Sequence, residues 1–124
     1  SHTDDSIVIF YGEASFQFPV SQEIMLGEDR GVLEQEIRDI AVADLNKDGR
    51  QDIVAACYAS QKVTVLFNES QDSKLPQRFR RESYTFAEGR PRALCVADFD
   101  VNERPDIAVA LWETNAVGIM RNVL

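Results

Sequence analysis

Two short segments of the chain carry oxygen-bearing side chains at alternating positions. In the first, residues 44–52, Asp or Asn stands at positions 1, 3, 5 and 9 and glycine at position 6; these are Asp44, Asn46, Asp48, Asp52 and Gly49. Calcium takes about six to eight oxygen ligands, which alternate residues of a tight loop can direct to one point. Glycine permits the positive φ of a sharp turn. The spacing therefore predicts a Ca2+-binding loop, to which position 7, Arg50, adds its backbone carbonyl.

The second segment, residues 98–106, repeats this pattern 54 residues later, with two departures. Glu103 stands at position 6, where a non-glycine residue in the left-handed region costs about 1–2 kcal/mol. Pro105 favours an extended conformation at Arg104. We expect the second loop to be the weaker site. The alternative for both is a solvated acidic turn with Asx-type hydrogen bonds, which explains one loop better than two aligned copies.

The flanks of the first loop differ from those of an EF-hand. That motif needs a bidentate Glu at position 12 and a helix on each side. Ala55 occupies position 12 here, and both flanking segments are short, apolar and rich in β-branched residues, which is typical of strands. The loop is therefore expected to join two strands of a hairpin.

The strands on either side belong to an internal repeat. Residues 37–68 align with residues 91–122 without a gap, and 6–12 resemble 62–68. A period of about 50 residues with mostly strand-like segments indicates propeller blades or a similar array. The strands expected are 37–43, 53–57, 63–67 and 79–86 in the first unit, 93–97, 107–111 and 117–121 in the second, and 7–10 and 18–26 before them.

Within each unit the first two strands are apolar at nearly every position, which is typical of strands covered on both faces. We expect the inner strands to be the driest. Residues 31–39 are the best helical candidate, although short, and 27–36 are expected to form a surface excursion.

The stretch "VADLNKDGRQDIVAA", followed by "VTVLFN", resembles an FG-GAP/VCBS repeat, the blade unit of the integrin α-subunit β-propeller. The resemblance covers residues 37–124 as two copies and 6–26 more weakly. It implies an all-β fold of four-stranded antiparallel propeller blades, about two in this chain plus extra N-terminal strands. The literal Phe-Gly and Gly-Ala-Pro signatures are absent, so the match is to the VCBS-like branch.

The resemblance also implies one Ca2+ in each loop that carries the motif. In the first loop it assigns as ligands Asp44, Asn46, Asp48, Arg50 through its carbonyl, and Asp52. In the second it assigns Asp98, Asp100, Asn102, Arg104 through its carbonyl, and Asp106.

The composition excludes several classes of function. A net charge of −8 argues against nucleic acid, whose phosphates need a basic surface. No apolar run approaches the roughly 20 residues of a membrane span, and no nucleophile–base constellation or phosphate-binding loop indicates an enzyme. Cys57 and Cys95 are expected to be buried free thiols, with a disulfide between them left open. Trp112 is expected to pack between blades or to stack on a ligand.

The domain organisation follows from the repeat. Residues 1–5 read as a tag or disordered N-terminus, 6–36 as a partial blade with its connection, 37–90 as the first repeat and 91–124 as the second, which lacks its last strand. A propeller needs at least about four blades. We therefore expect a homo-oligomer or part of a larger propeller, a small sandwich-like body being the third option.

For the function, we expect a non-enzymatic binding or adhesion scaffold, extracellular or at the cell surface, with an unknown protein or glycan ligand. The alternatives are a lectin-like propeller and a purely structural, self-assembling blade unit. Asn68-Glu69-Ser70 is an N-glycosylation sequon expected on a loop.

Overall fold

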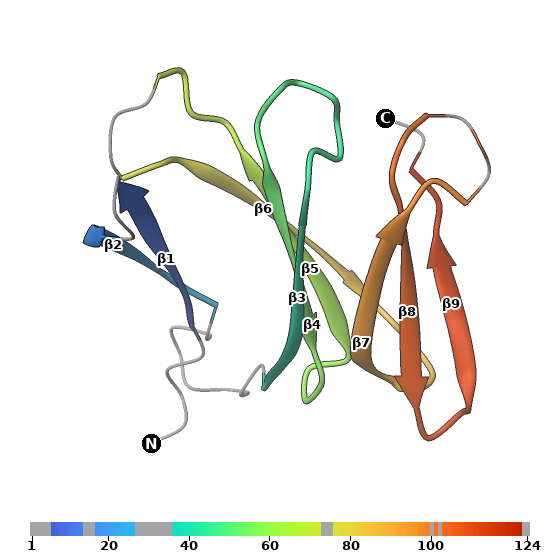
Figure 1. Ribbon diagram of the computed structural model, residues 1–124. Coiled ribbons are helices and arrows are strands. Elements are labelled where there is room, and N and C mark those ends of the chain that lie inside the picture. Colours follow the sequence, from blue (N-terminus) through green and yellow to red (C-terminus); the bar gives the residue numbers. More distant parts are fainter. Residues whose placement is uncertain are drawn as a thin grey trace.

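The computed structural model describes residues 6–13, 17–26, 36–72, 76–99, 101 and 103–122, and these form nine β strands (Figure 1). The strands are β1 (Ser6–Glu13), β2 (Gln17–Met25), β3 (Ile37–Ala43), β4 (Asp52–Cys57), β5 (Lys62–Asn68), β6 (Phe79–Thr85), β7 (Arg90–Ala97), β8 (Asp106–Trp112) and β9 (Ala116–Met120). The described residues contain no helix, and hence none of the length and apolarity that a membrane span needs.

The strands pair in chain order into three antiparallel sheets: a first sheet β1-β2, a second sheet β3-β4-β5-β6 and a third sheet β7-β8-β9. The prediction of an all-β fold with blade-like antiparallel sheets is confirmed. The second sheet has the four strands of a whole blade, whereas the third has three and the first has two. The three described sheets do not close into a ring.

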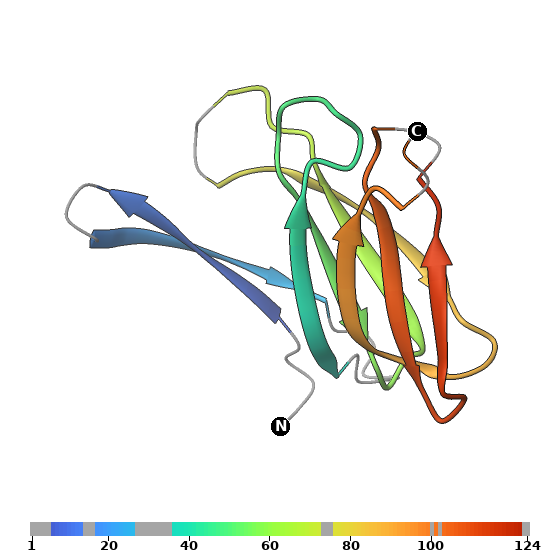
Figure 2. The same ribbon diagram turned by 45° about the vertical axis from the view of Figure 1, so that its right-hand side comes forward.

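The second and third sheets pack face to face (Figure 2). The core between them contains buried side chains from both sheets: Leu45, Val54, Val63, Val65, Phe67, Ile107 and Val109. Ala41 and Ala43 on β3 pack against this core, as do Leu94 and Val96 on β7. The interface is thus filled by small residues along β3 and by large ones along β5.

The first and second sheets share a separate core. Ile7 and Leu26 pack there against Ile53, Cys57 and Leu66 of the second sheet. The β1-β2 hairpin diverges from the other two sheets along its length (Figure 2). Its outward face carries the exposed side chains of Val8 and Phe10.

The expectation that the inner strands are the driest is right for β4 but wrong for β3 and β7. All six residues of β4 are buried, whereas β3 alternates between half-buried and exposed positions, and β7 is also largely exposed. The physical reason is position: β3 and β7 are the first strand of their sheets and pair on one side only. The apolar residues of β3 include Ile40 and Val42, which are 47 % and 57 % exposed.

Two further expectations need correction. Cys57 is buried, but Cys95 is exposed, and neither forms a disulfide. Cys95 lies on the face of β7 that no other described sheet covers. Asn68 is the last residue of β5 and is buried, rather than lying on an exposed loop, so its amide is poorly accessible to a glycosylating enzyme. The expected disordered N-terminus (1–5) and most of the expected surface excursion (27–36) and of the helical candidate (31–39) lie outside the described residues. The described end of the helical candidate, from Ile37, belongs to β3.

Candidate metal-binding loops

The first acidic segment forms the connection between β3 and β4, as the sequence predicts. Asp44, at the end of β3, accepts hydrogen bonds from the backbone N–H of Asp48 at 3.1 Å and of Gly49 at 2.8 Å. The loop therefore curls around the Asp44 carboxylate. Gly49 has a φ of +87°, which is the left-handed conformation expected at position 6, and Lys47 is also left-handed with a φ of 59°.

Three side chains of this loop converge. The side-chain NH2 group of Asn46 donates hydrogen bonds to Asp44 Oδ1 at 3.3 Å and to Asp48 Oδ1 at 3.1 Å. Turning the amide over would bring its oxygen to the same position. The same three side chains can therefore hold either a shared proton donor or a cation.

Asp52 occupies a different environment, at the start of β4. Its side chain is fully buried, and its two oxygens accept hydrogen bonds from the backbone N–H of Leu45 at 2.9 Å and of Asn68 at 2.8 Å. Burial raises the pKa of Asp52, the two hydrogen bonds oppose that shift, and the neighbouring charges of Asp48 and Asp44 add to it. Asp52 is thus close enough to the other carboxylates to feel their charge.

Arg50 closes the open side of the loop. Its backbone N–H donates to Asp48 Oδ1 at 2.9 Å, and its guanidinium donates to Asp48 Oδ2 at 3.2 Å and to the carbonyl of Ser70 in the β5–β6 connection. The backbone hydrogen bond from Arg50 lowers the pKa of Asp48 most, burial opposes it, and the guanidinium charge adds to the lowering. Asp48 therefore stays ionised.

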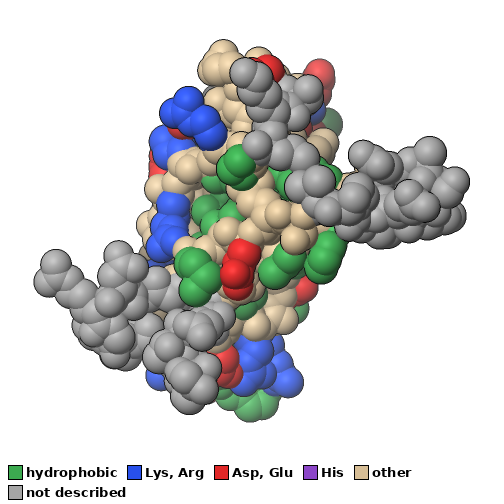
Figure 3. All heavy atoms as spheres, turned by 90° about the vertical axis from the view of Figure 1, so that its left-hand side faces the viewer, with side chains coloured by type: hydrophobic (Ala, Val, Ile, Leu, Met, Phe, Trp, Pro, Cys, Tyr) green, Lys and Arg blue, Asp and Glu red, His purple; other side chains and the backbone are tan. Residues whose placement is uncertain are grey.

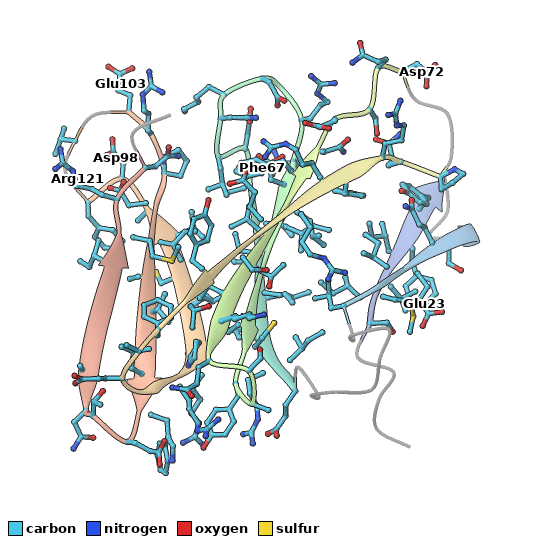
Figure 4. All side chains as sticks on the ribbon, turned by 180° about the vertical axis from the view of Figure 1, so that it is seen from behind. Glu23, Phe67, Asp72, Asp98, Glu103 and Arg121 are labelled. Carbon is cyan, nitrogen blue, oxygen red and sulfur yellow. The ribbon has the colours of Figure 1, made fainter. Side chains whose placement is uncertain are left out.

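The second loop, between β7 and β8, repeats the described parts of this geometry. Asp98 accepts a hydrogen bond from the backbone N–H of Glu103 at 2.6 Å, as Asp44 does from Gly49. Glu103 has a φ of +67°, so position 6 is left-handed even without glycine. Asp98 and Glu103 lie at one end of the third sheet (Figure 4). Asp100 and Asn102 fall outside the described residues.

Buried Asp106 repeats the bonding of Asp52. Its oxygens accept from the backbone N–H of Phe99 at 3.0 Å and of Asn122 at 2.7 Å. Sequence reasoning treated position 9 only as a ligand and missed this bond to the end of the third strand. The sequence did carry a signal for this bond. An asparagine ends both "VLFN" and "IMRN", and Asn68 and Asn122 follow their aspartates at the same sequence separation.

The described part of the chain contains no group of three or more His, Cys, Asp or Glu side chains placed to hold a metal ion. In the first loop, the side chains that converge are two aspartates and one asparagine, while Asp52 faces backbone N–H groups. The described geometry thus brings Asp44, Asn46 and Asp48 of the first predicted ligand set together and leaves Asp52 apart from them. Of the side-chain ligands predicted in the second loop, it describes only Asp98 and Asp106.

Comparison with known proteins identifies the family. A family model described as an FG-GAP-like repeat matches residues 44–109, from the first residue of the first loop to the middle of β8. No curated protein and no solved structure matches significantly. The matched segment is more than half of the chain and spans both acidic loops, so the chain belongs to the FG-GAP-like repeat family.

Proposed function

We propose that this chain binds Ca2+ in the β3–β4 loop and, more weakly, in the β7–β8 loop. The ligands in the first loop are Asp44, Asn46, Asp48, the Arg50 carbonyl and Asp52; those in the second are Asp98, Asp100, Asn102, the Arg104 carbonyl and Asp106. The observation that carries the proposal is the convergence of the Asn46 amide on two carboxylate oxygens within 3.3 Å. The two carboxylates that share this amide carry like charges and repel each other, and a hard cation between them would remove that repulsion.

The residues present fit such an ion in chemistry. Carboxylates, an amide and a backbone carbonyl are the oxygen donors that Ca2+ prefers. Asp44 keeps lone pairs for a cation, since each of its oxygens accepts only one backbone hydrogen bond. Arg50 holds Asp48 in its ionised form, and metal ligands must be deprotonated. Bound Ca2+ would supply charge neutralisation and loop order.

In this proposal Asn46 reports the state of the loop. Without metal, its amide N–H groups bond to the two carboxylates; with Ca2+, the amide turns over and its oxygen becomes a ligand. The side-chain NH2 resonances of Asn46 should therefore shift on adding Ca2+. Those of Asn115, which lies in the β8–β9 turn away from both loops, serve as the reference.

Isothermal titration calorimetry tests the proposal. We expect saturable binding of Ca2+, and a melting temperature that is higher in millimolar Ca2+ than in EDTA, because an ion that binds only the folded state stabilises it. Asp48→Asn should abolish the tighter event. Glu88→Gln removes the same charge from an exposed position outside both loops and should change nothing. Absence of binding heat together with an unchanged melt would refute the proposal.

We further propose that the loaded module acts as a non-enzymatic binding or adhesion scaffold outside the cell or on its surface. Calcium loops of extracellular modules bind the ion at roughly 10⁻⁴–10⁻³ M, so a calorimetric affinity in that range would support this location. The ligand is a protein or a glycan. Pull-down with the immobilised chain in Ca2+ and in EDTA separates a calcium-dependent partner from background.

A lectin-like role is the second candidate, and one observation favours it. Trp112 is 49 % exposed, and the guanidinium of Arg92 lies 4.5 Å from its ring centroid. An exposed indole beside a cation is suited to stacking on an acidic sugar. Binding on a glycan array that is lost in Trp112→Ala would support this role, and a blank array would leave the protein-binding scaffold.

A further inference from the structure

Exposed hydrophobic side chains gather at the two opposite ends of the stack of three sheets. At one end, the outward face of the first sheet carries Val8, Phe10 and Met25; we call it the first-sheet face. At the other, the third sheet and its loop carry Phe99, Trp112, Val117 and Ile119; we call it the third-sheet face. Phe10 is 63 % exposed and Val117 67 % exposed. Figure 3 looks onto the end that carries β1 and β2, where hydrophobic side chains interrupt the polar surface.

The third-sheet face is the repeat counterpart of a surface that is already buried inside the molecule. Val117 and Ile119 of β9 correspond, 54 residues on, to Val63 and Val65 of β5. Val63 and Val65 are 0 % and 2 % exposed because they pack against the third sheet. Leu45, buried in the same core, corresponds in turn to the exposed Phe99. The free face thus keeps the hydrophobic side chains of a sheet-to-sheet interface.

An arginine–aromatic pair repeats in the same way. Arg38 lies 4.4 Å from the ring of Tyr58, and its counterpart Arg92 lies 4.5 Å from Trp112. Tyr58 is also approached by Arg90 of the third sheet, 5.6 Å from the ring, whose guanidinium donates to the Tyr58 carbonyl at 3.3 Å. Trp112 therefore has an arginine of its own sheet beside its ring, Arg92. Among the described residues it has no arginine from a following sheet, as Tyr58 has in Arg90. Trp and Arg are the residues that most often dominate binding energy at interfaces.

The first-sheet face is the matching end. β1 is the counterpart of β5, 56 residues earlier, so Phe10 corresponds to Leu66. Leu66 points toward the preceding sheet and is buried against it, whereas Phe10 has no described sheet before it. In the part of the chain that the structure describes, no sheet follows the third and none precedes the first.

We propose that a second copy of this chain docks head to tail, its first-sheet face covering the third-sheet face of the first copy. This contact continues the stacking that already joins the first sheet to the second and the second to the third. Because its two surfaces differ, the contact is heterologous, so it builds a closed ring or an open chain of copies rather than a two-fold dimer. The inference does not rest on calcium binding.

Two single substitutions test the proposal. Ile119→Asp places a charge on the third-sheet face, and Phe10→Asp places one on the first-sheet face; both sites are more than half exposed, so the fold should survive. Multi-angle light scattering over a range of concentrations should give a mass of several copies for the wild type. Each variant alone should be a monomer, with the circular dichroism spectrum of the wild type.

Mixing the two variants decides the geometry. Each variant keeps one intact face, and the two intact faces are complementary, so an equimolar mixture should form a complex of two copies and nothing larger. Three results would overturn the proposal. They are a wild-type monomer at all concentrations, a stable dimer of Phe10→Asp alone, which indicates two third-sheet faces packed together, and a mixture that stays monomeric.

Discussion

The backbone N–H of Asn68, at the end of β5, donates a 2.8 Å hydrogen bond to the buried carboxylate of Asp52 at the start of β4. The other oxygen of the same carboxylate accepts from the N–H of Leu45 in the loop. One side chain therefore fixes three segments: the loop, the second strand and the end of the third. Asp106 makes the same two bonds in the next unit. The motif position read as a metal ligand is also the structural centre of each unit.

Asp52→Asn should destabilise the fold by about 1–3 kcal/mol, the cost of leaving one buried donor unsatisfied. An asparagine can accept only through its oxygen, so its NH2 group would face the second backbone N–H. Chemical denaturation in EDTA measures the change in the free energy of unfolding. Glu88→Gln, an exposed change of the same kind, is the control. Equal stability of the two variants would contradict the assigned role.

The stability of the metal-free chain should depend on pH through Asp52. Its pKa is raised above the ordinary value of 3.8, chiefly by burial, so the folded state keeps this proton to higher pH than the unfolded state. The contribution of Asp52 to the free energy of unfolding therefore falls as pH rises from about 3.8 through the raised pKa. Asp48, whose pKa is lowered, contributes stability that is lost only as pH falls below 3.8.

The difference in unfolding free energy between wild type and Asp52→Asn isolates this effect, because the asparagine does not titrate. In EDTA, the advantage of the wild type should shrink as the pH rises above about 3.8. Saturating Ca2+ should remove the decline, since the ion favours the ionised carboxylate. A difference that is flat across pH 3 to 7 would show that Asp52 titrates alike in both states.

Glu103→Gly should stabilise the second loop, by up to about 1 kcal/mol, because it removes a side chain from a left-handed residue. The converse change, Gly49→Ala, should cost about 1–2 kcal/mol. A Cβ at Gly49 would meet no atom within 4 Å, so this loss measures backbone strain alone. Thermal melts of both variants test the two predictions. Glu103→Gly should raise the melting temperature and Gly49→Ala should lower it.

Gly89→Ala should cost more than Gly49→Ala. Both glycines are left-handed, with φ of +83° and +87°, but a Cβ at Gly89 would lie 3.0 Å from the Leu111 Cβ and from the Thr114 hydroxyl. Steric overlap with a packed strand thus adds to the backbone cost. Chemical denaturation measures the free energy of unfolding of both variants. Equal destabilisation would mean that the β8–β9 turn shifts to accommodate the Cβ without cost.

Cys95 should react with a thiol reagent in the folded protein, whereas Cys57 should react only on unfolding, because the first is exposed and the second is buried. Cys95→Ser should therefore eliminate the fast phase of labelling. Head-to-tail docking adds a second expectation: the fast phase should slow with rising protein concentration, since Cys95 lies on the side of β7 that a second copy approaches. Dilution should restore it.

Local patterns allowed much of the fold to be predicted. The β-branched runs and the turn residues located every strand, and β3 has the predicted bounds 37–43. The 54-residue repeat also identified the equivalent loops. Exposure could not be predicted in the same way, because the burial of Ile40 or Cys95 depends on whether another sheet lies beside it. The residues of a strand can have the apolar pattern of a strand covered on both faces even when no sheet lies against one of those faces.

The role of Asp52 was hidden for a related reason. Its spacing within the loop is visible in the sequence, but its bond to Asn68 joins residues on two strands whose register depends on the whole sheet. The two arginine–aromatic pairs, Arg38 with Tyr58 and Arg92 with Trp112, could not be predicted either, because no local sequence pattern indicates them.

The two alanines of β3 have a geometric consequence. Ala41 and Ala43 face the third sheet at one margin of the interface, while Val63, Val65 and Phe67 fill the margin along β5. Two sheets separated by methyl groups on one side and by branched or aromatic side chains on the other form a wedge. Successive wedges turn about an axis on the side of β3 and β7, so the size difference between alanine and valine fixes the direction in which the array curves.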